Sequence, residues 1–480
     1  MTDAVVASLA KPTRTADEQK ACPTSMSVRQ GLSINVPVPG FTPDQISVQL
    51  MSGGGVQTDV VPAPGGSTIL VTAPHGTPPS ADAHIVITTH GPDGTTSTRT
   101  IPIIVSQIAV SYDDGDDDQN VGTRDSPFHT LGHAAGVARA GDTIEIFATQ
   151  SGPDGPDIEN LTSPHVSVPS GVTIEGIDVT TRIFVGLDLA GDVTFNRGRL
   201  QQRLFITAPG SHVAVQDMTV FDGITIASSA VGASLTVSGG MTEILSDDDL
   251  DSPVSVNAAK ASVSLESQAT IRSTGATYGT RPQIRMRDAS ATQSLTLMDI
   301  TMVSSGNAPF LDLSGANTVV FQRSSITGPI DISAPKANAT LVNTQFMGFG
   351  GLKFGGDTLM VSGCLFDGVP IEQSGSKSRA RVQYTKFDNY TTYAYHLVEG
   401  VLDLGNATDL GFNEFTAGMA YMAKPTALVI DAPGTDTATV SATTFNGVSV
   451  EPCQIIADST TSTSNGIYII EQPGFTIDFY

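Results

Sequence analysis

The sequence predicts an all-β protein in which a small β-sandwich precedes a long stack of short parallel strands. Composition is the first observation, because the 480 residues include 48 glycines and only 15% charged residues, which suits short strands joined by tight turns. The second is a series of apolar runs between Pro and Gly turns near the N-terminus. The third is an internal repeat in the second half, with steps of 20 to 30 residues, a spacing typical of a solenoid.

Residues 1–26 are predicted to form an N-terminal arm that anchors the protein to a neighbour, since they show little apolar periodicity. Residues 27–109 contain a series of short β-rich runs, and Pro92–Asp93–Gly94 between two of them indicates a hairpin turn. Five or more short strands in so short a segment predict an immunoglobulin-like β-sandwich. The predicted strands are Ser33–Val38, Ile46–Met51, Ser67–Ala73, His84–Thr89 and Arg99–Val105.

Residues 110–141 are predicted to form an acidic linker and a capping α-helix. Asp125 or Ser126 suits the N-cap, Pro127 the first turn, and Gly141 the end. The residues between these signals place an apolar face on one side of the helix, made of Phe128, Leu131, Ala135 and Ala138. A lone helix of about 13 residues is marginal in water. We therefore expect it to pack its apolar face on the open end of the strand stack.

Residues 142–450 carry the repeat, in which one apolar anchor is followed five places later by a second, often Phe. Residues five apart on a straight strand point to opposite faces. If both anchors are buried, a corner must lie between them, which predicts a parallel β-helix with phenylalanines filling its coils. Larger steps around Phe415 indicate loops or longer coils, and residues 451–480 are expected to form a C-terminal cap. The anchor pairs are Val215/Val220, Leu297/Met302, Phe321/Ile326, Leu341/Phe346, Val361/Phe366, Val382/Phe387, Leu410/Phe415 and Val440/Phe445.

Three runs, Asp116–Thr123, Ser126–Leu131 and Ala140–Ile144, resemble the segment that leads into the first coil of pectate-lyase-like right-handed β-helix proteins. Val172–Gly176 looks like the first full coil that follows it. The resemblance implies a right-handed single-stranded parallel β-helix with an N-terminal capping α-helix. That superfamily includes polysaccharide lyases, glycoside hydrolases and viral spikes, so the resemblance predicts a fold and leaves the function open.

An enzyme that cleaves polysaccharide needs a carboxylate pair, or Ca²⁺ with a base, stacked on one outward column of successive coils. Neither column that we inspected holds adjacent carboxylates, and the polygalacturonase-type signatures are not present in order. The sequence therefore predicts no catalytic and no cofactor-binding residue. The column before the second anchor reads Thr219, Thr301, Ser325, Gln345, Leu365, Lys386, Glu414 and Thr444. The column two places after the first anchor reads Asp217, Asp299, Arg323, Asn343, Gly363 and Tyr384.

Two groups invite a metal. The run Asp113, Asp114 and Asp116–Asp118 binds Ca²⁺ or forms a solvated hinge, and we favour the hinge because the glycine and closing Glu of an EF-hand are missing. His129 and His133 lie four apart on the predicted helix but lack the Glu and third ligand of a zinc site. We predict no metal ligand, and Ca²⁺ is the one cofactor that the sequence leaves open.

A basic cluster of Arg281, Arg285 and Arg287 allows two interpretations. It holds an anionic sugar or supplies a base for elimination, or it pairs with acids on a neighbouring coil, such as Asp247–Asp249 or Asp251. We favour pairing. The three cysteines, Cys22, Cys364 and Cys453, are an odd number spread along the chain and imply no disulfide framework.

Charge and composition disfavour several classes of binding partner. A formal charge of −24 disfavours nucleic acid and anionic membranes. No apolar run approaches the roughly 18 residues of a membrane helix, and residues 1–20 have no secretion-signal pattern. The chain has no Trp and 6% aromatic residues, which argues against a saccharide cleft because sugars commonly lie on aromatic faces.

The leading hypothesis is a virion surface protein, a head decoration or a tailspike. Its N-terminal part attaches to capsid or tail proteins, and its β-helix projects outward for stabilisation or for adhesion to a host glycan or receptor. Resemblance to phage β-helix spikes implies a homotrimer. Two alternatives stay open: a polysaccharide lyase or glycoside hydrolase that acts on host glycans, with its site between subunits, and a bacterial surface adhesin with its own export partner.

Overall fold

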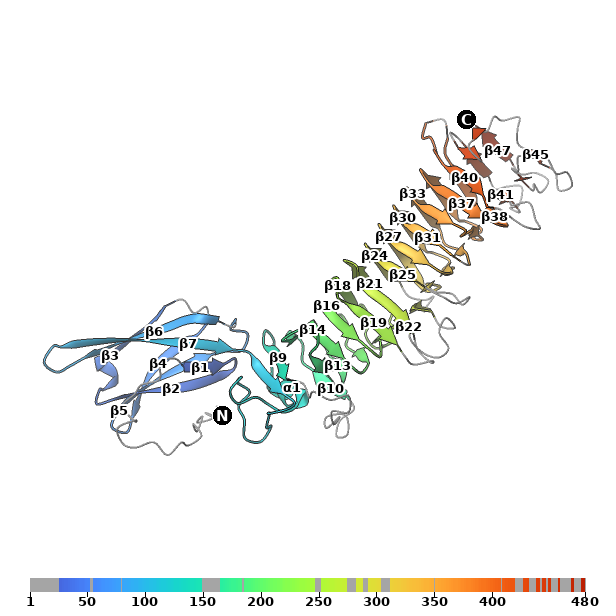
Figure 1. The fold of residues 1–480 in the computed structure, drawn as a ribbon. Coiled ribbons are helices and arrows are strands. Elements are labelled where there is room, and N and C mark those ends of the chain that lie inside the picture. The colour runs from blue at the N-terminus through green and yellow to red at the C-terminus, as the bar shows by residue number, and fades with distance from the viewer. Residues whose placement is uncertain are drawn as a thin grey trace. The chain divides into compact units, whose positions relative to one another are not determined.

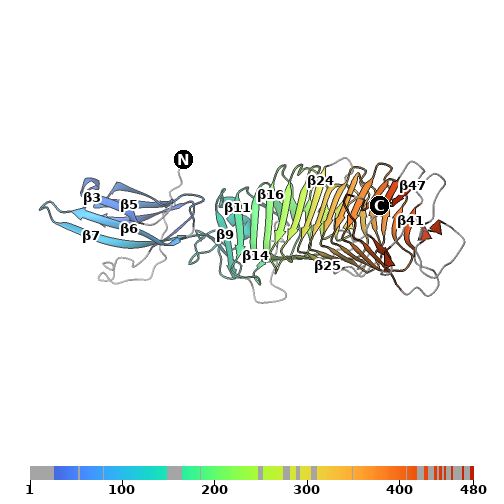
Figure 2. The same ribbon diagram turned by 90° about the horizontal axis from the view of Figure 1, so that it is seen from above.

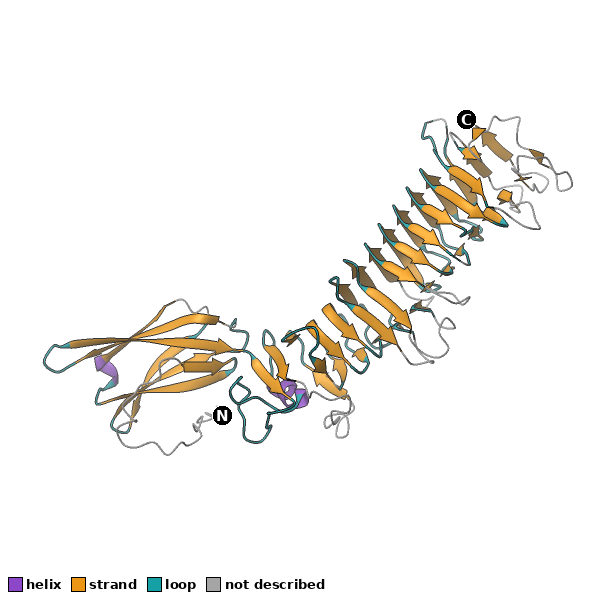
Figure 3. Ribbon diagram, viewed as in Figure 1, coloured by secondary structure: helices purple, strands orange, loops and turns teal. Residues whose placement is uncertain are grey.

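The computed structural model is all-β, with a single short α-helix among the described residues (Figure 3). It divides into two units, Met1–Gly198 and Arg199–Tyr480. The described residues are 26–480 apart from 52–54, 79, 149–164, 184, 247–251, 274–281, 288–291, 304–310, 349, 407, 419–425, 431–436, 441–442, 446–447, 450–455, 458–467, 470–475 and 480. Outside them lie the predicted arm up to residue 25, Cys22, Cys453, Arg281, Asp247–Asp251, most of the predicted C-terminal cap, and the side chains of Val440 and Phe445.

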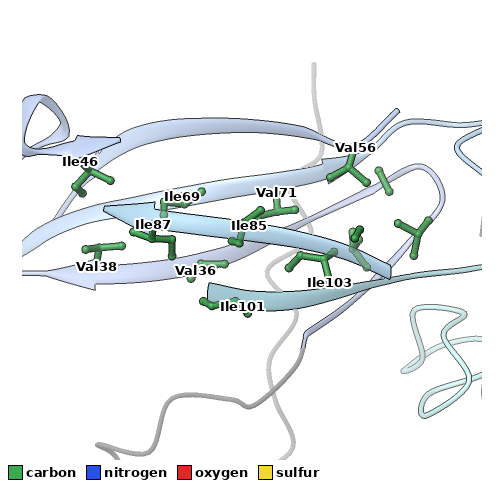
Figure 4. Packing of buried hydrophobic residues seen from close by; sticks show 14 residues of the cluster. Val36, Val38, Ile46, Val56, Ile69, Val71, Ile85, Ile87, Ile101 and Ile103 are labelled. Carbon is green, nitrogen blue, oxygen red and sulfur yellow. The ribbon is translucent and has the colours of Figure 1, made fainter. Parts of the chain in front are cut away.

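The first unit begins with two sheets that share one hydrophobic core (Figure 4). Alternate residues of each strand point inward, among them Val36, Ile69, Ile85 and Ile101, each at most 3% exposed. One sheet has the order β1 (Met26–Arg29), β7 (Thr96–Ser106), β6 (Ser80–His90) and β3 (Ile46–Met51), and the other has β2 (Leu32–Pro39), β5 (Gly66–Ala73) and β4 (Gln57–Ala63). Paired strands are antiparallel except β1, which is parallel to β7.

The five strands predicted here are present as β2, β3, β5, β6 and β7, and the predicted hairpin joins β6 to β7 through a turn in which Gly94 has φ +79°. The prediction missed β1 and β4. β1 has only four residues, too few for a clear alternation. β4 pairs only with β5 and contains Asp59 and Pro62, residue types that an edge strand accepts but that conceal it in a sequence.

A helix of seven residues, α1 (Leu131–Val137), begins five residues later than Ser126. Thr130 is its N-cap, and its side chain accepts a hydrogen bond from His133 N. The predicted caps Asp125 and Ser126 are therefore wrong. The reason is that residues 126–128 bond elsewhere: Phe128 N donates to Ala109 O, and Ser111 N donates to Phe128 O. The predicted apolar face is buried, since Phe128, Leu131, Ala135 and Ala138 are at most 3% exposed.

The first coils follow the helix within the same unit. β8 (Ile108–Ser111), β9 (Thr143–Ala148), β11 (Val172–Gly176) and β14 (Val193–Leu200) pair in parallel, and β10 (His165–Val168) pairs in parallel with β13 (Gly186–Leu189). β12 (Arg182–Ile183) lies between β11 and β14 in the strand order. The helix α1 packs against β10 and β8.

A cluster of polar groups, two of them buried and one exposed, joins the sandwich strands to the first coil. Asp142 is fully buried, and its carboxylate accepts hydrogen bonds from Gly76 N at 2.9 Å and Arg139 N at 2.9 Å and contacts His75 Nδ1 at 2.5 Å. Gln30 is also fully buried and bridges Thr77 O, at 2.7 Å, and Thr143 N, at 3.0 Å. We call Gln30, His75 and Asp142 the junction cluster.

The second unit is a stack of parallel coils with a β-helix-like architecture (Figures 1 and 2). Each coil contributes one strand to each of up to three parallel sheets. Sheet I contains β15 (Leu204–Ile206), β17 (Ile224–Ile226), β20 (Val254–Val256), β23 (Ile284–Met286), β26 (Leu311–Asp312), β29 (Ile330–Ile332), β32 (Leu352–Phe354), β35 (Ile371–Gln373), β38 (Tyr393–Leu397) and β41 (Thr426–Ile430).

Sheets II and III follow in each coil. Sheet II contains β16 (His212–Val220), β18 (Ser234–Ser238), β21 (Ser262–Glu266), β24 (Gln293–Met298), β27 (Ala316–Gln322), β30 (Asn338–Val342), β33 (Thr358–Ser362), β36 (Arg379–Gln383), β39 (Val401–Leu404), β42 (Thr437–Val440) and β47 (Thr476–Phe479), with β19 (Glu243–Ser246) and β22 (Thr270–Ser273) joined to it. Sheet III contains β25 (Thr301–Val303), β28 (Ser325–Thr327), β31 (Gln345–Met347), β34 (Leu365–Asp367), β37 (Lys386–Tyr390), β40 (Glu414–Ala417), β43 (Thr444–Phe445) and β44 (Val448–Ser449), and β45 (Ile456–Ala457) pairs separately with β46 (Tyr468–Ile469).

The corner that the five-residue offset predicts is present between sheets II and III. The residue two places after the first anchor has a left-handed backbone in coil after coil, with φ +56° at Asp299, +49° at Arg323 and +65° at Gly363. This turn brings both anchors inside, so that Phe321 and Ile326, for example, are fully buried. The prediction of a bend between two buried anchors is confirmed for these coils.

A column of small polar residues lines the inner side of this corner. Each member precedes the second anchor by two places, is at most 3% exposed, and bonds to backbone groups of the turn; the column is Ser324, Thr344, Cys364, Thr385, Asn413 and Thr443. Thr385 Oγ1, for example, donates to Gln383 O at 2.8 Å. We call this set the inner polar column. It satisfies backbone groups that a sharp buried turn leaves without partners.

The second anchors of sheet III form a continuous stack of aromatic rings. Phe346, Phe366, Phe387 and Phe415 are at most 1% exposed, and their ring centroids are 4.6, 5.0 and 4.6 Å apart in sequence. This confirms that these phenylalanines fill the coils. One anchor is wrong. Strand register pairs Ala380 with Leu402, which places the fully buried Leu404, not Leu410, beside Val382, because the described residues between Leu404 and Glu414 belong to no strand.

Candidate functional site

A column of charged residues lies on the outer face of sheet I in the second unit. In each of its short strands, an apolar residue stands on either side of a variable one. The two apolar residues point into the core, and the middle one points outward. Strand register aligns these middle residues from coil to coil. In order along the sheet they are Arg285, Asp312, Asp331, Lys353, Glu372 and His396, and we call this set the charged column.

The centre of the charged column is a pair of aspartates. Asp312 and Asp331 are register partners on neighbouring strands, which places their backbones roughly 4.8 Å apart. Asp312 has a side chain only 6% exposed, pairs with Arg287, and accepts a hydrogen bond from Ser314 Oγ at 2.9 Å. Asp331 Oδ1 is buried and accepts no hydrogen bond from the described residues. A carboxylate enclosed by an Arg and a Ser is poorly placed to receive a substrate.

The far end of the charged column is more open. Glu372 lies between Lys353 and His396 in register, and Tyr393 Oη contacts Glu372 Oε2 at 3.5 Å. Burial and the neighbouring carboxylate of Glu372 raise the pKa of Tyr393. Acid, base and phenol therefore stand side by side here, and the arrangement offers hydrogen bonds of both kinds to a polar ligand.

Of the predicted basic cluster, Arg287 pairs with an acid of a neighbouring coil, and Arg281 lies outside the described residues. Arg287 binds Asp312 on the next coil, and Arg285 Nη2 donates to Ser255 Oγ at 3.5 Å. The acids suggested from the sequence, Asp247–Asp249 and Asp251, lie outside the described residues. Asp312 is 25 residues from Arg287 in sequence, and the coil repeat makes the two residues neighbours.

Two further carboxylate pairs lie side by side in register. Asp367 and Asp388 are partners in sheet III, where Lys386 Nζ is 2.9 Å from Asp388 Oδ2 and Asn389 Nδ2 donates to Asp367 Oδ1 at 2.7 Å. In the first unit, Glu145 and Glu175 are partners on β9 and β11. Arg124 binds Glu145, and Arg197 binds Glu175. In each of the three pairs, at least one carboxylate is engaged by a cation of the chain itself.

The two columns inspected in the sequence lie at the corner between sheets II and III and on sheet III. The column two places after the first anchor is the left-handed corner itself, where Arg323 binds both carboxylate oxygens of Asp299 at 2.7 Å and lowers the pKa of Asp299. The column before the second anchor is aligned in sheet III, and there Lys386 Nζ lies 3.8 Å from Glu414 Oε1.

The acidic run before the helix is exposed at Asp113, Asp114, Asp116 and Asp118, and two of its carboxylates also order the loop. Asp117 accepts hydrogen bonds from the backbone N–H groups of His129 and Thr130 and from Thr130 Oγ1, and Asp116 accepts from Asp118 N and Gln119 N. Asp117 therefore holds the loop against the start of α1, and Asp116 closes a turn within the loop. His133 packs its ring on Phe128, with centroids 4.5 Å apart. Across the described residues, no group of three or more metal-ligating side chains gathers.

No known protein family, curated protein or solved structure significantly matches this chain. The fold and the site are therefore defined by the structure alone: an all-β protein with large parallel, β-helix-like sheets. No helix in the described ranges is long and apolar enough to cross a membrane.

Sequence reasoning missed both the charged column and the pair Asp367 and Asp388. A usable signal was present. The triplets Ile284–Met286, Ile330–Ile332 and Leu352–Phe354 share an apolar residue on each side of a charged one. Aligning these triplets, instead of only the anchors of sheets II and III, would have placed Arg285, Asp331 and Lys353 in one column. The pair in sheet III would have followed from inspecting the residue after the second anchor.

Proposed function

We propose that this chain is a virion surface protein, a head decoration or tailspike, that attaches through its N-terminal part and presents its coils for stabilisation or host adhesion. The observation that carries the proposal is that cations of the chain itself pair with the carboxylates of neighbouring strands. Where carboxylates meet on neighbouring strands, Arg124, Arg197, Arg287 and Lys386 engage them, three of these cations from a coil next to the carboxylate's own or from the segment before the first coil. Such pairing holds coils together, whereas a glycosidase needs two accessible carboxylates in different protonation states.

Two structural features support a mechanical role. The stack from Phe346 to Phe415 fills four successive coils with parallel rings, and aromatic stacking of this kind adds to the free energy of burial. Within the first unit, the junction cluster joins the sandwich strands to the first coil with buried and partly buried hydrogen bonds. Tight packing of the coils and a first coil tied to the sandwich suit a projecting particle component.

We also propose the finer details of the fold, from strand order and burial. The sheets β2-β5-β4 and β3-β6-β7, with β1 beside β7, follow the strand order of an immunoglobulin-like sandwich. Parallel strands joined by crossovers are almost always right-handed, which favours a right-handed single-stranded parallel β-helix. The burial of Leu131 and Ala135, with α1 packed on β8 and β10, supports a capping role for the helix.

Quantitative mass spectrometry of purified virus particles from the source tests the proposal. Tens to hundreds of copies per particle support a head decoration, and a handful supports a tailspike. Absence of the chain from every particle contradicts the proposal. Capsid or tail proteins are the expected partners, and cross-linking on the particle should join them to the N-terminal part.

A homotrimer is part of the proposal, because viral β-helix spikes, which the sequence resembles, are trimeric. Sedimentation velocity of the full chain at neutral pH is expected to give a single species of three times the chain mass of 49.7 kDa. A single species of one chain mass, unchanged over a wide concentration range, contradicts the trimer.

A polysaccharide lyase or glycoside hydrolase remains the second candidate, favoured by one observation. Glu372, His396 and Tyr393 lie together at the open end of the charged column, with Lys353 beside them. If this end is catalytic, host capsule or lipopolysaccharide incubated with the chain will release reducing or unsaturated ends. Glu372→Gln should then abolish the release without changing the thermal unfolding temperature, whereas a structural role leaves no release to abolish.

A further inference from the structure

Two aromatic side chains, Tyr384 and Phe412, are exposed at the corner between sheets II and III. Their side chains are 57% and 51% exposed, and their rings stack with centroids 5.6 Å apart and planes 17° apart. We call this pair the aromatic platform. It corrects the expectation that the phenylalanines are all committed to the core, because Phe412 lies outside while Phe415, three residues later, is fully buried.

The backbone at these two positions makes aromatic residues an unexpected choice. Tyr384 has φ +51° and Phe412 has φ +50°. The corresponding corners of preceding coils hold Asp299, Arg323, Asn343 and Gly363. Asp, Asn and Gly tolerate this left-handed conformation and Arg323 pairs with Asp299, whereas a bulky side chain there costs roughly 1 kcal/mol or more. Backbone preference does not favour these rings and burial does not require them, so the exposed pair is available to a ligand.

Polar groups lie at one edge of the aromatic platform. Gln383, next to Tyr384, donates its Nε2 to Asp409 Oδ1 at 2.7 Å. Asp409 also pairs with Arg381, whose Nε lies 4.0 Å from Asp403. Two carboxylates thus face one guanidinium, and this edge keeps a net negative charge with several hydrogen-bond acceptors.

The other side of Tyr384 is formed by Gly363, the corner residue of the preceding coil. Gly363 N donates to Gln383 O at 3.1 Å, which places the two corners side by side. Gly363 has no side chain to cover the ring, and a Cβ at this position would collide with Asn343 Oδ1. The amide of Asn343 therefore lies against Gly363, at the corner next to that of Tyr384.

The chemistry of these surroundings selects the ligand. An anionic sugar or a phosphate would meet Asp403 and Asp409 in a chain of charge −24. A pyranose ring has one face of C–H groups, which the electron-rich face of an aromatic ring attracts, and an edge of hydroxyls, which carboxylates and amides bind. We propose that Tyr384 and Phe412 bind a neutral pyranose ring of a glycan, whose hydroxyls reach Asp409, Gln383 and Asn343.

This inference rests on the adhesive role proposed above and gives it a site and a ligand class. The test begins with the full chain on an array of neutral hexose oligosaccharides and matched oligosaccharides that contain uronic or sialic acid. Binding to neutral members and not to their acidic counterparts is expected. Absence of binding to any neutral member overturns the inference.

Asparagine variants then locate the binding. Tyr384→Asn and Phe412→Asn remove the rings but place a residue suited to left-handed backbone, so the thermal unfolding temperature should stay equal or rise. Affinity for the bound oligosaccharide, measured by titration calorimetry, should fall at least tenfold in each variant. Met241→Asn is the matched control, because Met241 is 59% exposed elsewhere in the same unit, and it should keep full affinity.

Other outcomes separate this site from the rival explanations. Unchanged affinity in both asparagine variants overturns the inference, and so does a shift from trimer to single chains in sedimentation, which would make the platform a contact between copies. The virion proposal fails separately, if particles lack the chain while purified protein still binds neutral glycan through Tyr384.

Discussion

Cys364 occupies a position of the inner polar column that other coils give to Ser, Thr or Asn. Its thiol is 3% exposed and its sulfur lies 3.3 Å from Leu341 O and 3.5 Å from Ser362 O. Burial raises the pKa of the thiol from 9.0 to about 11. The folded state therefore favours the neutral thiol, and the contribution of this group to stability is present below pH 9 and is lost as the pH rises through about 11.

We predict that Cys364 resists alkylation in the folded protein. At pH 8 its thiolate fraction is about a hundredfold lower than that of an ordinary thiol, and burial blocks the reagent further. The measurement is iodoacetamide labelling of a Cys22→Ser and Cys453→Ser double variant, read by mass spectrometry. Labelling is compared in buffer and in about 8 M urea, a concentration that unfolds most domains. Labelling in the absence of urea at a rate close to that in urea would contradict the buried position.

Phe366 lies at the centre of the stacked rings, between Phe346 and Phe387. We predict that Phe366→Ala lowers the free energy of unfolding by about 3–5 kcal/mol, because the cavity cannot close between two fixed rings. Phe366→Leu should cost less, since Ile326 already fills the same position of sheet III. Circular dichroism during urea unfolding provides the measurement. Met360→Ala, at a side chain 40% exposed on the same coil, is the control and should change little.

The junction cluster acts at the scale of an element, because Asp142 holds the turn of residues 75–77 against the beginning of β9. The same carboxylate opposes the effect of burial on Arg29, whose pKa burial nevertheless lowers to about 10. We predict that Asp142→Asn costs about 3–5 kcal/mol, as expected when a buried charge loses its partner and an amide replaces an acceptor among N–H donors. Limited proteolysis should then cut near residues 139–143.

A control variant shows whether that cleavage results from the loss of the Asp142 carboxylate. Asp93→Asn changes an exposed aspartate in the β6–β7 hairpin, where Asp93 Oδ1 accepts a hydrogen bond from Thr95 N at 3.1 Å, and it should leave both stability and the cleavage pattern unchanged. If Asp142→Asn behaves like Asp93→Asn, the junction cluster does not hold these elements together.

The predictability of each element follows from how local its signal is. The corner between sheets II and III was predictable, since two buried anchors such as Leu341 and Phe346 encode it within six residues of sequence. The helix start was not, because Phe128 bonds to Ala109 and Ser111, which are distant in sequence. The charged column depends on strand register, because its members are 19 to 27 residues apart and no fixed period aligns them. The spacing of residues in the sequence alone therefore could not predict the contacts between coils.

The excess of acid is a property of the whole molecule. With 48 acidic and 24 basic residues, most carboxylates repel one another at neutral pH, and this repulsion opposes folding. Exposed pairs such as Arg323 with Asp299 offset little of it, because surface ion pairs contribute roughly 0–1 kcal/mol. Salt weakens both effects, since the Debye length falls from about 30 Å at 0.01 M to about 3 Å at 1 M. Rising salt therefore weakens the repulsion between distant carboxylates before it weakens the attraction within close ion pairs.

We therefore predict that raising NaCl from low to high concentration at pH 7 increases the thermal unfolding temperature by a few degrees. The sequence pI of about 4.4 supplies the control, because net charge is small near that pH and the salt effect should shrink as the pH approaches 5. Differential scanning fluorimetry over a grid of pH and salt measures both trends. A fall in unfolding temperature with salt at pH 7 would mean that the ion pairs linking coils, led by those of Arg124, Arg197 and Arg287, outweigh the repulsion of the unpaired acids.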